Sequence, residues 1–364
     1  MVAFVEESKL RSLKDLFPNR MPISQYLNYI DWFSLLQYIE EHGYCRGGNH
    51  FRYDPLLMLK LIVVKCFRQL SYRDTVASLS QEDCYNLGVP LGEDGYHLPA
   101  HSTLHHFVKY RLKAEGFEML MHIIGRTICR DSGETSGIID STPLEASRYN
   151  KDAVYNPHYQ CKMDKAHIFH LGEFPITCCI SGGTEADALY ALSLVDDVNA
   201  MNPKLTAVFA DGGYDSFQIH AGISYHLKAR PYIDPRDSAV VNEEGTEPRI
   251  DHWVNRMWKV GGSIHDPLSM KLRFLYEHGR SEQVGMYLRN QNLLDPSFRE
   301  TYARRGDCER THNHIKSIVK FDIRGLRTDS KRLYLLMNFV VYQILLLGHL
   351  QNGIRPAQHL AQYF

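Results

Sequence analysis

The sequence of 364 residues has almost no net charge, no cysteine pair of the C-x-x-C type, no internal repeat and no low-complexity tract. Lys and Arg number 41 against 42 Asp and Glu, so overall charge gives no attraction to nucleic acid and only local basic segments can supply one. The hydrophobic fraction of 44% and the charged fraction of 23% exclude a disordered chain. We therefore expect a soluble globular protein with one large domain or two ordinary ones.

Zinc-like cysteine spacing is also missing from the sequence. The eight cysteines are scattered along the chain: Cys45, Cys66, Cys84, Cys129, Cys161, Cys178, Cys179 and Cys308. The opening MVAFVEESKL lacks the basic flank and apolar stretch of a signal peptide. Both observations are typical of a reduced cytosolic protein, so we expect a cytoplasmic location.

Only one apolar run approaches the length of a membrane span, LYLLMNFVVYQILLLGHL at 333–350. It contains Asn338 and Gln343, and nothing else in the sequence resembles it. We interpret this segment as a buried core helix and expect no membrane partner.

The first 130 residues show apolar residues at helical spacing between short breakers. Helices are predicted at 54–70, where Asp54 precedes a proline, at 71–81, and within 101–113. No convincing strand is found there. The pattern predicts an all-α N-terminal domain over about 1–130.

The pattern changes near residue 136, where short β-branched runs begin to alternate with helical segments. Strands are predicted at 136–140, 165–171, 175–182, 204–211 and 227–233. Helices are predicted at 184–198, 216–226, 307–320 and 331–350, and Asp215 is expected to cap the second of them. This order predicts an α/β domain with a mixed sheet flanked by helices over 135–350, with an insertion at about 234–300 and a C-terminal tail at 351–364.

Two carboxylates, Asp140 and Asp211, are each expected to end a strand. Side chains at the carboxyl edge of such a sheet stand clear of the packed layers, which is where α/β proteins build binding sites. Small or polar residues follow both, Ser141 after the first and a Gly-Gly pair after the second. Asp is also favoured in turns, so each residue taken alone is better explained as a turn cap.

A third carboxylate, Glu309, lies in the basic segment YARRGDCERTHNHIK at 302–316. On one helix, Tyr302, Arg305 and Lys316 would lie within roughly 40° of Glu309 around the axis. Gly306 interrupts this stripe, because a helix beginning after it leaves Tyr302 and Arg305 on the approach. The alternative is an ordinary exposed face with an Arg305–Glu309 pair.

Three carboxylates together suit a divalent metal site. Mg²⁺ and Mn²⁺ prefer hard oxygen ligands, and two such ions about 4 Å apart activate a nucleophile and stabilise a leaving oxygen in phosphoryl transfer. Neighbouring Arg, Lys and Tyr side chains would then hold the phosphates of a nucleic-acid backbone.

Three segments, IIDST (138–142), FADGGYDS (209–216) and YARRGDCERTHNHIK (302–316), resemble the catalytic motifs of bacterial and archaeal insertion-sequence transposases with an RNase H-like DDE domain. The last segment fits the spacing Tyr-(2)-Arg-(3)-Glu-(6)-Lys of that superfamily. Segments YDPLLMLKLIVVKCF and HSTLHHFVKYRL also resemble the helical domain that precedes catalysis in this group.

The resemblance implies an RNase H-like fold and a DNA transposase that hydrolyses phosphodiester bonds at element ends and joins the 3′-OH to target DNA. Asp140, Asp211 and Glu309 would be the catalytic residues and the ligands of two Mg²⁺ or Mn²⁺ ions. Tyr302, Arg305 and Lys316 would contact DNA near the cleaved end. Expected partners are double-stranded DNA, with inverted repeats at the element ends, and a second copy of the chain, as a homodimer on DNA in the nucleoid; no small-molecule substrate is expected.

Further DNA contacts are predicted from local charge. Residues 289–332 hold eleven Arg or Lys and six acids, a local excess that attracts phosphates. Within it, Arg310 and His312 are candidate contacts, although a solvated helix explains His312 equally well. In the N-terminal domain, the acid-free segment 101–113 is a candidate recognition helix with these contacts: Thr103, His105 and Lys109. A helix that simply packs its apolar residues is the competing interpretation.

Three alternatives remain open from the sequence. A zinc site using Asp164, His167 and His170 is disfavoured because no complete tetrahedral set can be assembled at the usual spacing. A nuclease with the RNase H fold would cut DNA without strand transfer. A degenerate copy would bind DNA without catalysis, although all three carboxylates are present.

Overall fold

The computed structural model describes residues 21–41, 53–146, 150, 153–241, 267–319, 328–354 and 360. The tryptophans Trp253 and Trp258 of the predicted insertion and the basic residues Arg324 and Arg327 lie outside this part. The chain divides into two compact units. The first comprises Met1–Ser132, Leu144–Asp164 and Arg310–Phe364, and the second comprises Gly133–Pro143 and Lys165–Glu309.

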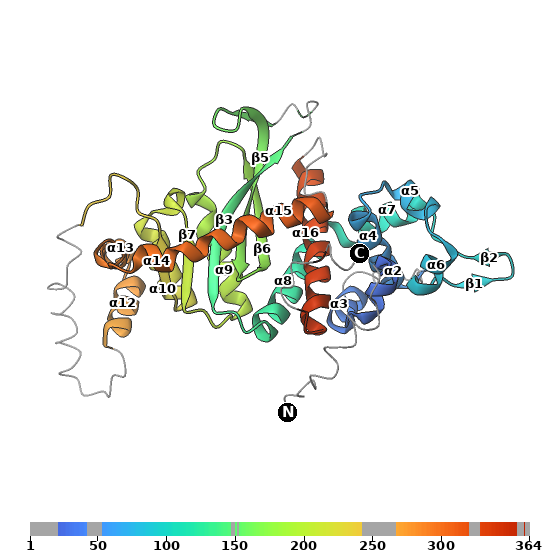
Figure 1. The fold of residues 1–364 in the computed structure, drawn as a ribbon, viewed down its shortest axis with the longest axis horizontal. Coiled ribbons are helices and arrows are strands. Elements are labelled where there is room, and N and C mark those ends of the chain that lie inside the picture. Colours follow the sequence, from blue (N-terminus) through green and yellow to red (C-terminus); the bar gives the residue numbers. More distant parts are fainter. Residues whose placement is uncertain are drawn as a thin grey trace. The chain divides into compact units, whose positions relative to one another are not determined.

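The first unit is mainly helical (Figure 1). Its N-terminal helices are α2 (Ile23–Tyr26), η1 (Leu27–Tyr29), α3 (Phe33–Ile39), α4 (Pro55–Phe67), α5 (Tyr72–Ala77), α6 (Gln81–Leu87), α7 (His101–His106), the π-helix η3 (Phe107–Leu112) and α8 (Lys113–Asp131). A short hairpin, β1 (Leu91–Gly92) and β2 (Gly95–Tyr96), interrupts them, so the prediction of no strand in this region was wrong at one tight turn.

The local signals in the sequence explain where these helices begin. Asp54 accepts a hydrogen bond from the Leu56 amide at the start of α4, and Ser71 caps α5 through the Asp74 amide. These side chains satisfy amides that have no partner within the helix. The predicted helices at 54–70 and 71–81 are therefore confirmed as α4 and, for its first part, α5.

Helix α16 (Thr328–Gln351) is the apolar segment singled out in the sequence. By length and composition, Ser330–Gln351 passes as a membrane span, and most of that stretch is buried inside the protein. It packs against α8 and α4, and the Tyr26 hydroxyl donates to the Leu345 carbonyl at 2.9 Å. The buried-helix interpretation fits these contacts.

Six strands form the main sheet, in the order β4-β5-β3-β7-β8, with β6 paired to β5. They are β3 (Ser136–Glu145), β4 (Val154–Asn156), β5 (Cys161–Leu171), β6 (Phe174–Gly182), β7 (Ala207–Ala210) and β8 (Arg230–Ile233). Strands β3, β7 and β8 are parallel, whereas β4 and β5 are antiparallel. A helical N-terminal region followed by this mixed sheet with helices confirms the predicted fold class and is consistent with an RNase H-like fold.

Helices of the second unit cover the sheet (Figure 1). Helix α9 (Ala188–Met201) packs on β6, and α10 (Phe217–Leu227) packs on β8 and α9. Two further helices, α12 (Pro267–Glu277) and α13 (Ser281–Leu294), lie in the described part of the predicted insertion and pack against α10. The chain then forms α14 (Phe298–Tyr302), the 3₁₀ turn η6 (Ala303–Gly306) and α15 (Asp307–Val319).

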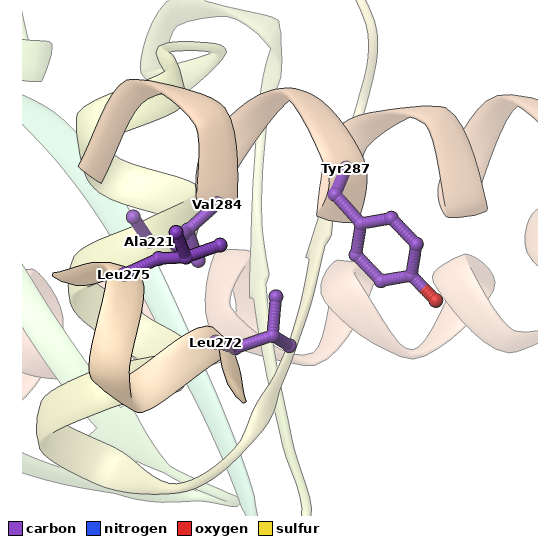
Figure 2. Packing of buried hydrophobic residues seen from close by; sticks show 5 residues of the cluster. All are labelled: Ala221, Leu272, Leu275, Val284 and Tyr287. Atoms are coloured by element: carbon purple, nitrogen blue, oxygen red, sulfur yellow. The ribbon is translucent and has the colours of Figure 1, made fainter. Parts of the chain in front are cut away.

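An apolar cluster joins three of these helices (Figure 2). Its buried members are Ala221, Leu272, Leu275, Val284 and Tyr287, from α10, α12 and α13. Gly285 allows the close approach, because a Cβ there would lie 2.0 Å from the carbonyl oxygen of Phe217. Helices α12 and α13 are thereby fixed against the body of the second unit.

Two local predictions need correction. Asp140 does not end its strand, because β3 continues to Glu145, although its parallel pairing with β7 stops one residue before Asp140. Asp215 is not the cap of α10, a position taken by Ser216. Instead, the buried Asp215 carboxylate accepts from Arg289 at 2.6 Å and faces His220 at 3.3 Å.

Candidate active site

Asp140 and Asp211 lie next to each other because their strands are parallel and adjacent. The last paired residues of β3 and β7 are Ile139 and Ala210, and each aspartate is the next residue along its chain. Asp140 is buried, with 6% of its surface exposed. Asp211 is more accessible, with 36% of its side chain exposed. The predicted convergence of two carboxylates at this edge of the sheet is what the structure has.

Backbone amides orient both carboxylates. The Ser141 amide donates to Asp140 Oδ1 at 2.9 Å. The Gly213 amide donates to Asp211 Oδ1 at 2.9 Å, so Asp211 caps the 3₁₀ turn η4 (Gly212–Tyr214). The Cys308 thiol donates to Asp140 Oδ2 at 3.1 Å from the start of α15. Both oxygens of Asp140 therefore have a partner, and Asp211 has one oxygen held by the turn.

Arg305 connects all three predicted carboxylates. Its Nη2 atom lies 3.0 Å from Asp140 Oδ1 and 3.5 Å from Asp211 Oδ2. Its Nη1 atom lies 3.9 Å from Glu309 Oε1, and the Glu309 side chain is 67% exposed. Asp140, Asp211 and Glu309 are thus arranged around one guanidinium cation.

The approach to α15 explains how Arg305 reaches this position. Tyr302 ends α14 and Arg305 lies in the 3₁₀ turn η6, so neither shares the helix of Glu309. The Tyr302 hydroxyl donates to the Ala210 carbonyl at 3.3 Å, and its ring stacks on Phe298 with centroids 5.5 Å apart. A single helix carrying all four residues is therefore wrong. The other expectation, that the helix begins after Gly306 and leaves Tyr302 and Arg305 on the approach, is confirmed.

Electrostatics at the two aspartates follow from burial and proximity. Burial raises the pKa of Asp211, and the neighbouring Asp140 charge raises it further, against the opposing effect of Arg305. Burial alone would lower the pKa of Arg305, but Asp140 and the other anionic neighbours outweigh it and the pKa is raised. Two close carboxylates at this edge therefore require a cation, and Arg305 supplies it here.

A fourth carboxylate, Asp187, was missed in the sequence. Its Oδ2 atom accepts from the Ser141 hydroxyl at 2.8 Å, and its Oδ1 atom lies 2.6 Å from Lys165 Nζ. The Nδ1 atom of the buried His167 is 4.0 Å from the same Oδ1 atom. Since the Ser141 amide holds Asp140, Asp187 is one residue removed from the predicted ligands. The sequence signal for Asp187 was its place at the start of a helix. It was missed because the helix was expected to start at Thr184, whereas α9 begins directly after Asp187.

The remaining predicted residues of α15 lie in the first unit. Lys316 is half-buried, and burial lowers its pKa against the effect of Glu145. His312 is 6% exposed, whereas Arg310 is exposed. Their roles as DNA contacts stay predictions.

In the N-terminal helices, Thr103 and Lys109 are exposed and His105 is half-buried. The His105 ring packs edge-on against Tyr72, with centroids 5.3 Å apart. Leu104, which faces the core, is fully buried. An exposed polar face and a packed apolar face coexist on this segment, so both interpretations of the helix stand.

The carboxylate oxygens of Asp140 and Asp211 are the kind of donor that a divalent ion prefers. Within the described ranges, no three His, Cys, Asp or Glu side chains converge closely enough to hold one ion. Asp140 and Asp211 nevertheless present hard oxygen atoms to one shared cation, the Arg305 guanidinium, and Glu309 reaches that cation too. The zinc site that the sequence disfavoured gains no support from these residues, since Asp164 pairs with Lys331 at 2.8 Å and His167 bonds Ser181 at 2.7 Å.

Comparison with known proteins agrees with this geometry. Residues 131–344 match the model of the family described as Transposase DDE domain, and residues 11–110 match that of Transposase domain (DUF772). None of the curated proteins or solved structures compared with the chain matches it. A DDE transposase domain implies transposase activity, and transposases act on DNA. The larger match spans more than half of the chain and includes Asp140, Asp211 and Glu309, and the chain belongs to the DDE transposase family.

Proposed function

We propose that this protein hydrolyses phosphodiester bonds at the ends of an insertion sequence and transfers the freed 3′-OH to target DNA. The observation that supports this is the arrangement of Asp140, Asp211 and Glu309 around one guanidinium in a DDE transposase domain. The spacing Tyr302-(2)-Arg305-(3)-Glu309-(6)-Lys316, which fits the signature of one transposase superfamily, also supports the proposal.

Asp140, Asp211 and Glu309 would hold the Mg²⁺ or Mn²⁺ ions that DDE transposases generally use. When bound, two divalent ions supply Lewis-acid activation of the attacking hydroxyl and charge neutralisation at the leaving oxygen. Asp140 is held on both oxygens, so it is the fixed donor, whereas exposed Glu309 has the freedom to approach. With those ions bound, Arg305 would no longer be needed to neutralise the carboxylates and would be available to hold a phosphate.

The other residues of the signature act on DNA. Arg305 and Lys316 hold phosphate oxygens through charge-assisted hydrogen bonds, and Tyr302 supports the β7 end and contacts the strand near the cleaved bond. Arg310 and His312 extend this contact along α15.

We further propose that residues 1–130 form the end-binding domain and that 135–350 form the catalytic domain. Thr103, His105 and Lys109 contact the inverted repeat, with the helix in the groove of the duplex. Two element ends are held together by a homodimer on DNA, in the cytoplasm at the nucleoid.

The test is cleavage of end-containing oligonucleotides with Mg²⁺ or Mn²⁺. Asp140→Asn and Glu309→Gln should each abolish cleavage, while the exposed Glu300→Gln and Asp237→Asn retain it. Cleavage by the first two variants at the rate of the parent would show that the active site is elsewhere. A target plasmid in the same reaction separates a transposase, which joins the ends, from a nuclease, which only cuts.

A further inference from the structure

A hollow in the second unit lies at the opposite ends of the strands from the carboxylates. It has a volume of about 510 Å³ and is bounded by the ends of α9 and α10, the start of β8, and α12 and α13. Arg230 opens β8 and pairs in register with Ala207, the first residue of β7, whereas Asp211 follows the last. Four strand residues separate the two ends, roughly 10 to 13 Å.

Three cations line this hollow: Lys228, Arg230 and Arg273. Among the described residues no acidic side chain lines it, but three acids flank it. Asp196 Oδ1 lies 3.7 Å from Nδ1 of His226, which also lines the hollow. Arg230 Nη2 lies 2.6 Å from Asp295 Oδ2, and Arg273 Nε lies 2.8 Å from Glu277 Oε1. A guanidinium has five N–H donors, so each arginine retains donors for a second anion. The lining therefore suits a group with several acceptor oxygens, such as a phosphate.

The remaining lining is mixed, with the polar residues Asn199, Ser224 and His226 beside Tyr225 and four apolar residues. Tyr225 stacks on Tyr276 with ring centroids 4.1 Å apart, and the Tyr225 hydroxyl donates to Glu277 at 3.2 Å. Leu272 and Val284, which also line the hollow, belong to the buried cluster of Figure 2. The Tyr225 ring is thus held in place, next to apolar side chains that accept the face of a planar ring.

The cations and the fixed aromatic ring of this hollow match the two parts of a nucleotide, its phosphate and its base. A phosphate is bound by the cations. Any of the nucleobases can stack on an aromatic side chain, because each has a flat π face. The volume is within the usual range for small-ligand sites.

We propose that this hollow binds one nucleoside phosphate unit, with its phosphate on Lys228, Arg230 and Arg273 and its base against Tyr225. A free nucleotide and an unpaired nucleotide of a DNA strand share this chemistry. The site is separate from the Asp140–Asp211 edge and does not depend on the proposed reaction.

Calorimetric titrations of the full chain in EDTA test this. The probes are deoxyadenosine 5′-monophosphate, a five-nucleotide single strand of deoxyadenosine, and inorganic phosphate. Lys228→Gln combined with Arg273→Gln should weaken binding of the monophosphate about tenfold or more. For the single strand, the same change should lower the slope of log affinity against log salt by about one for each cation removed.

Tyr225 is tested separately. Tyr225→Leu should weaken binding about fivefold or more through lost stacking, whereas Tyr225→Phe, which keeps the ring, should bind as the parent does. The matched control, Lys204→Gln with Arg280→Gln, removes two exposed cations outside the lining and should leave binding unchanged. Asp140→Asn should also bind normally, which separates this site from the catalytic edge.

Tighter binding of the single strand identifies a DNA strand as the source of the ligand, and tighter binding of the monophosphate identifies a free nucleotide. Three results would overturn the proposal: no binding of any probe, inorganic phosphate binding as tightly as the monophosphate, or lining variants that bind as the control does. Unchanged circular dichroism of each variant checks that it folds.

Discussion

The two ends of the parallel strands in the second unit differ in the sign of the charge they gather. Just past the last paired residues of β3 and β7, Asp140 and Asp211 share one arginine with Glu309. At the start of β8, three cations line a hollow whose described lining has no acid, although three acids flank it. The first arrangement has more negative charge than one guanidinium neutralises, so it attracts cations. The second presents the N–H donors of two arginines and a lysine, to which we propose that a phosphate binds, so the two ends of the strands would bind ligands of opposite charge.

The largest expected effect comes from removing the shared cation. Arg305→Gln leaves Asp140 and Asp211 facing each other without compensation. We expect a loss of about 3 kcal/mol in the free energy of unfolding, at the low end for a broken buried pair because Arg305 and Asp211 are partly exposed. Urea unfolding measures it, and added Mg²⁺ should recover part of the loss.

Arg304→Gln is the matched control, since Arg304 is exposed. Equal destabilisation by the two substitutions would show that the position of Arg305 between the carboxylates has no energetic importance.

At the other end, Gly285→Ala should disturb the wall of the hollow. Its Cβ would lie 2.0 Å from the Phe217 carbonyl oxygen, so α13 must move away from α10. We expect a loss of about 2 kcal/mol of stability, as for other overpacked sites. Thermal unfolding measures this, with Gly306→Ala as the control because its Cβ meets no atom within 4 Å. A Gly285→Ala protein as stable as that control would mean that the helix contact is looser than described.

Asp187→Asn tests whether the carboxylate end extends beyond the three predicted residues. Asp187 holds the Ser141 hydroxyl, and the Ser141 amide holds Asp140. Loss of such an indirect contact lowers metal affinity or activity by roughly 10- to 100-fold. Mn²⁺ binding followed by electron paramagnetic resonance measures it, with exposed Asp237→Asn as control. Parent-like Mn²⁺ affinity would limit the site to the predicted residues.

The smallest effect concerns pH. Burial and Asp140 raise the pKa of Asp211, so the folded protein holds that proton more tightly than the unfolded chain. The stability linked to this proton is complete below the unfolded pKa of about 3.9 and is lost as pH rises through the folded value. Asp211→Asn should therefore stabilise the protein at pH 7, by less than about 1 kcal/mol because the group is partly exposed, and not at pH 3. Urea unfolding at both pH values checks this, and a gain that is equal at the two would contradict it.

How much of this site the sequence predicts depends on the range of the interactions. The closeness of Asp140 and Asp211 is predictable because each follows the last paired residue of two neighbouring parallel strands. The position of Arg305 is not predictable. It depends on the turn η6, which precedes the helix of Glu309 and directs the Arg305 side chain toward the carboxylates. That contact spans 165 residues of chain to Asp140, and no local pattern encodes it.

Element boundaries account for the other errors. Ser-Thr-Pro after Asp140 is typical of a strand end, yet β3 continues because it also pairs with β5 on its other side. Asp187 was placed inside a helix that begins one residue later. In both cases tertiary pairing overrode a local propensity, which a single sequence does not reveal.

The extra length of β3 has a mechanical consequence. Asp140 is a residue in the middle of a ten-residue strand, with backbone fixed on both sides, whereas Asp211 lies at the start of a three-residue turn. When ligands exchange at this site, the side chains that move are therefore those of Asp211, Glu309 and Arg305, while Asp140 keeps its position. In such an enzyme the Asp140 carboxylate keeps the same position through successive steps, while the other groups change partners.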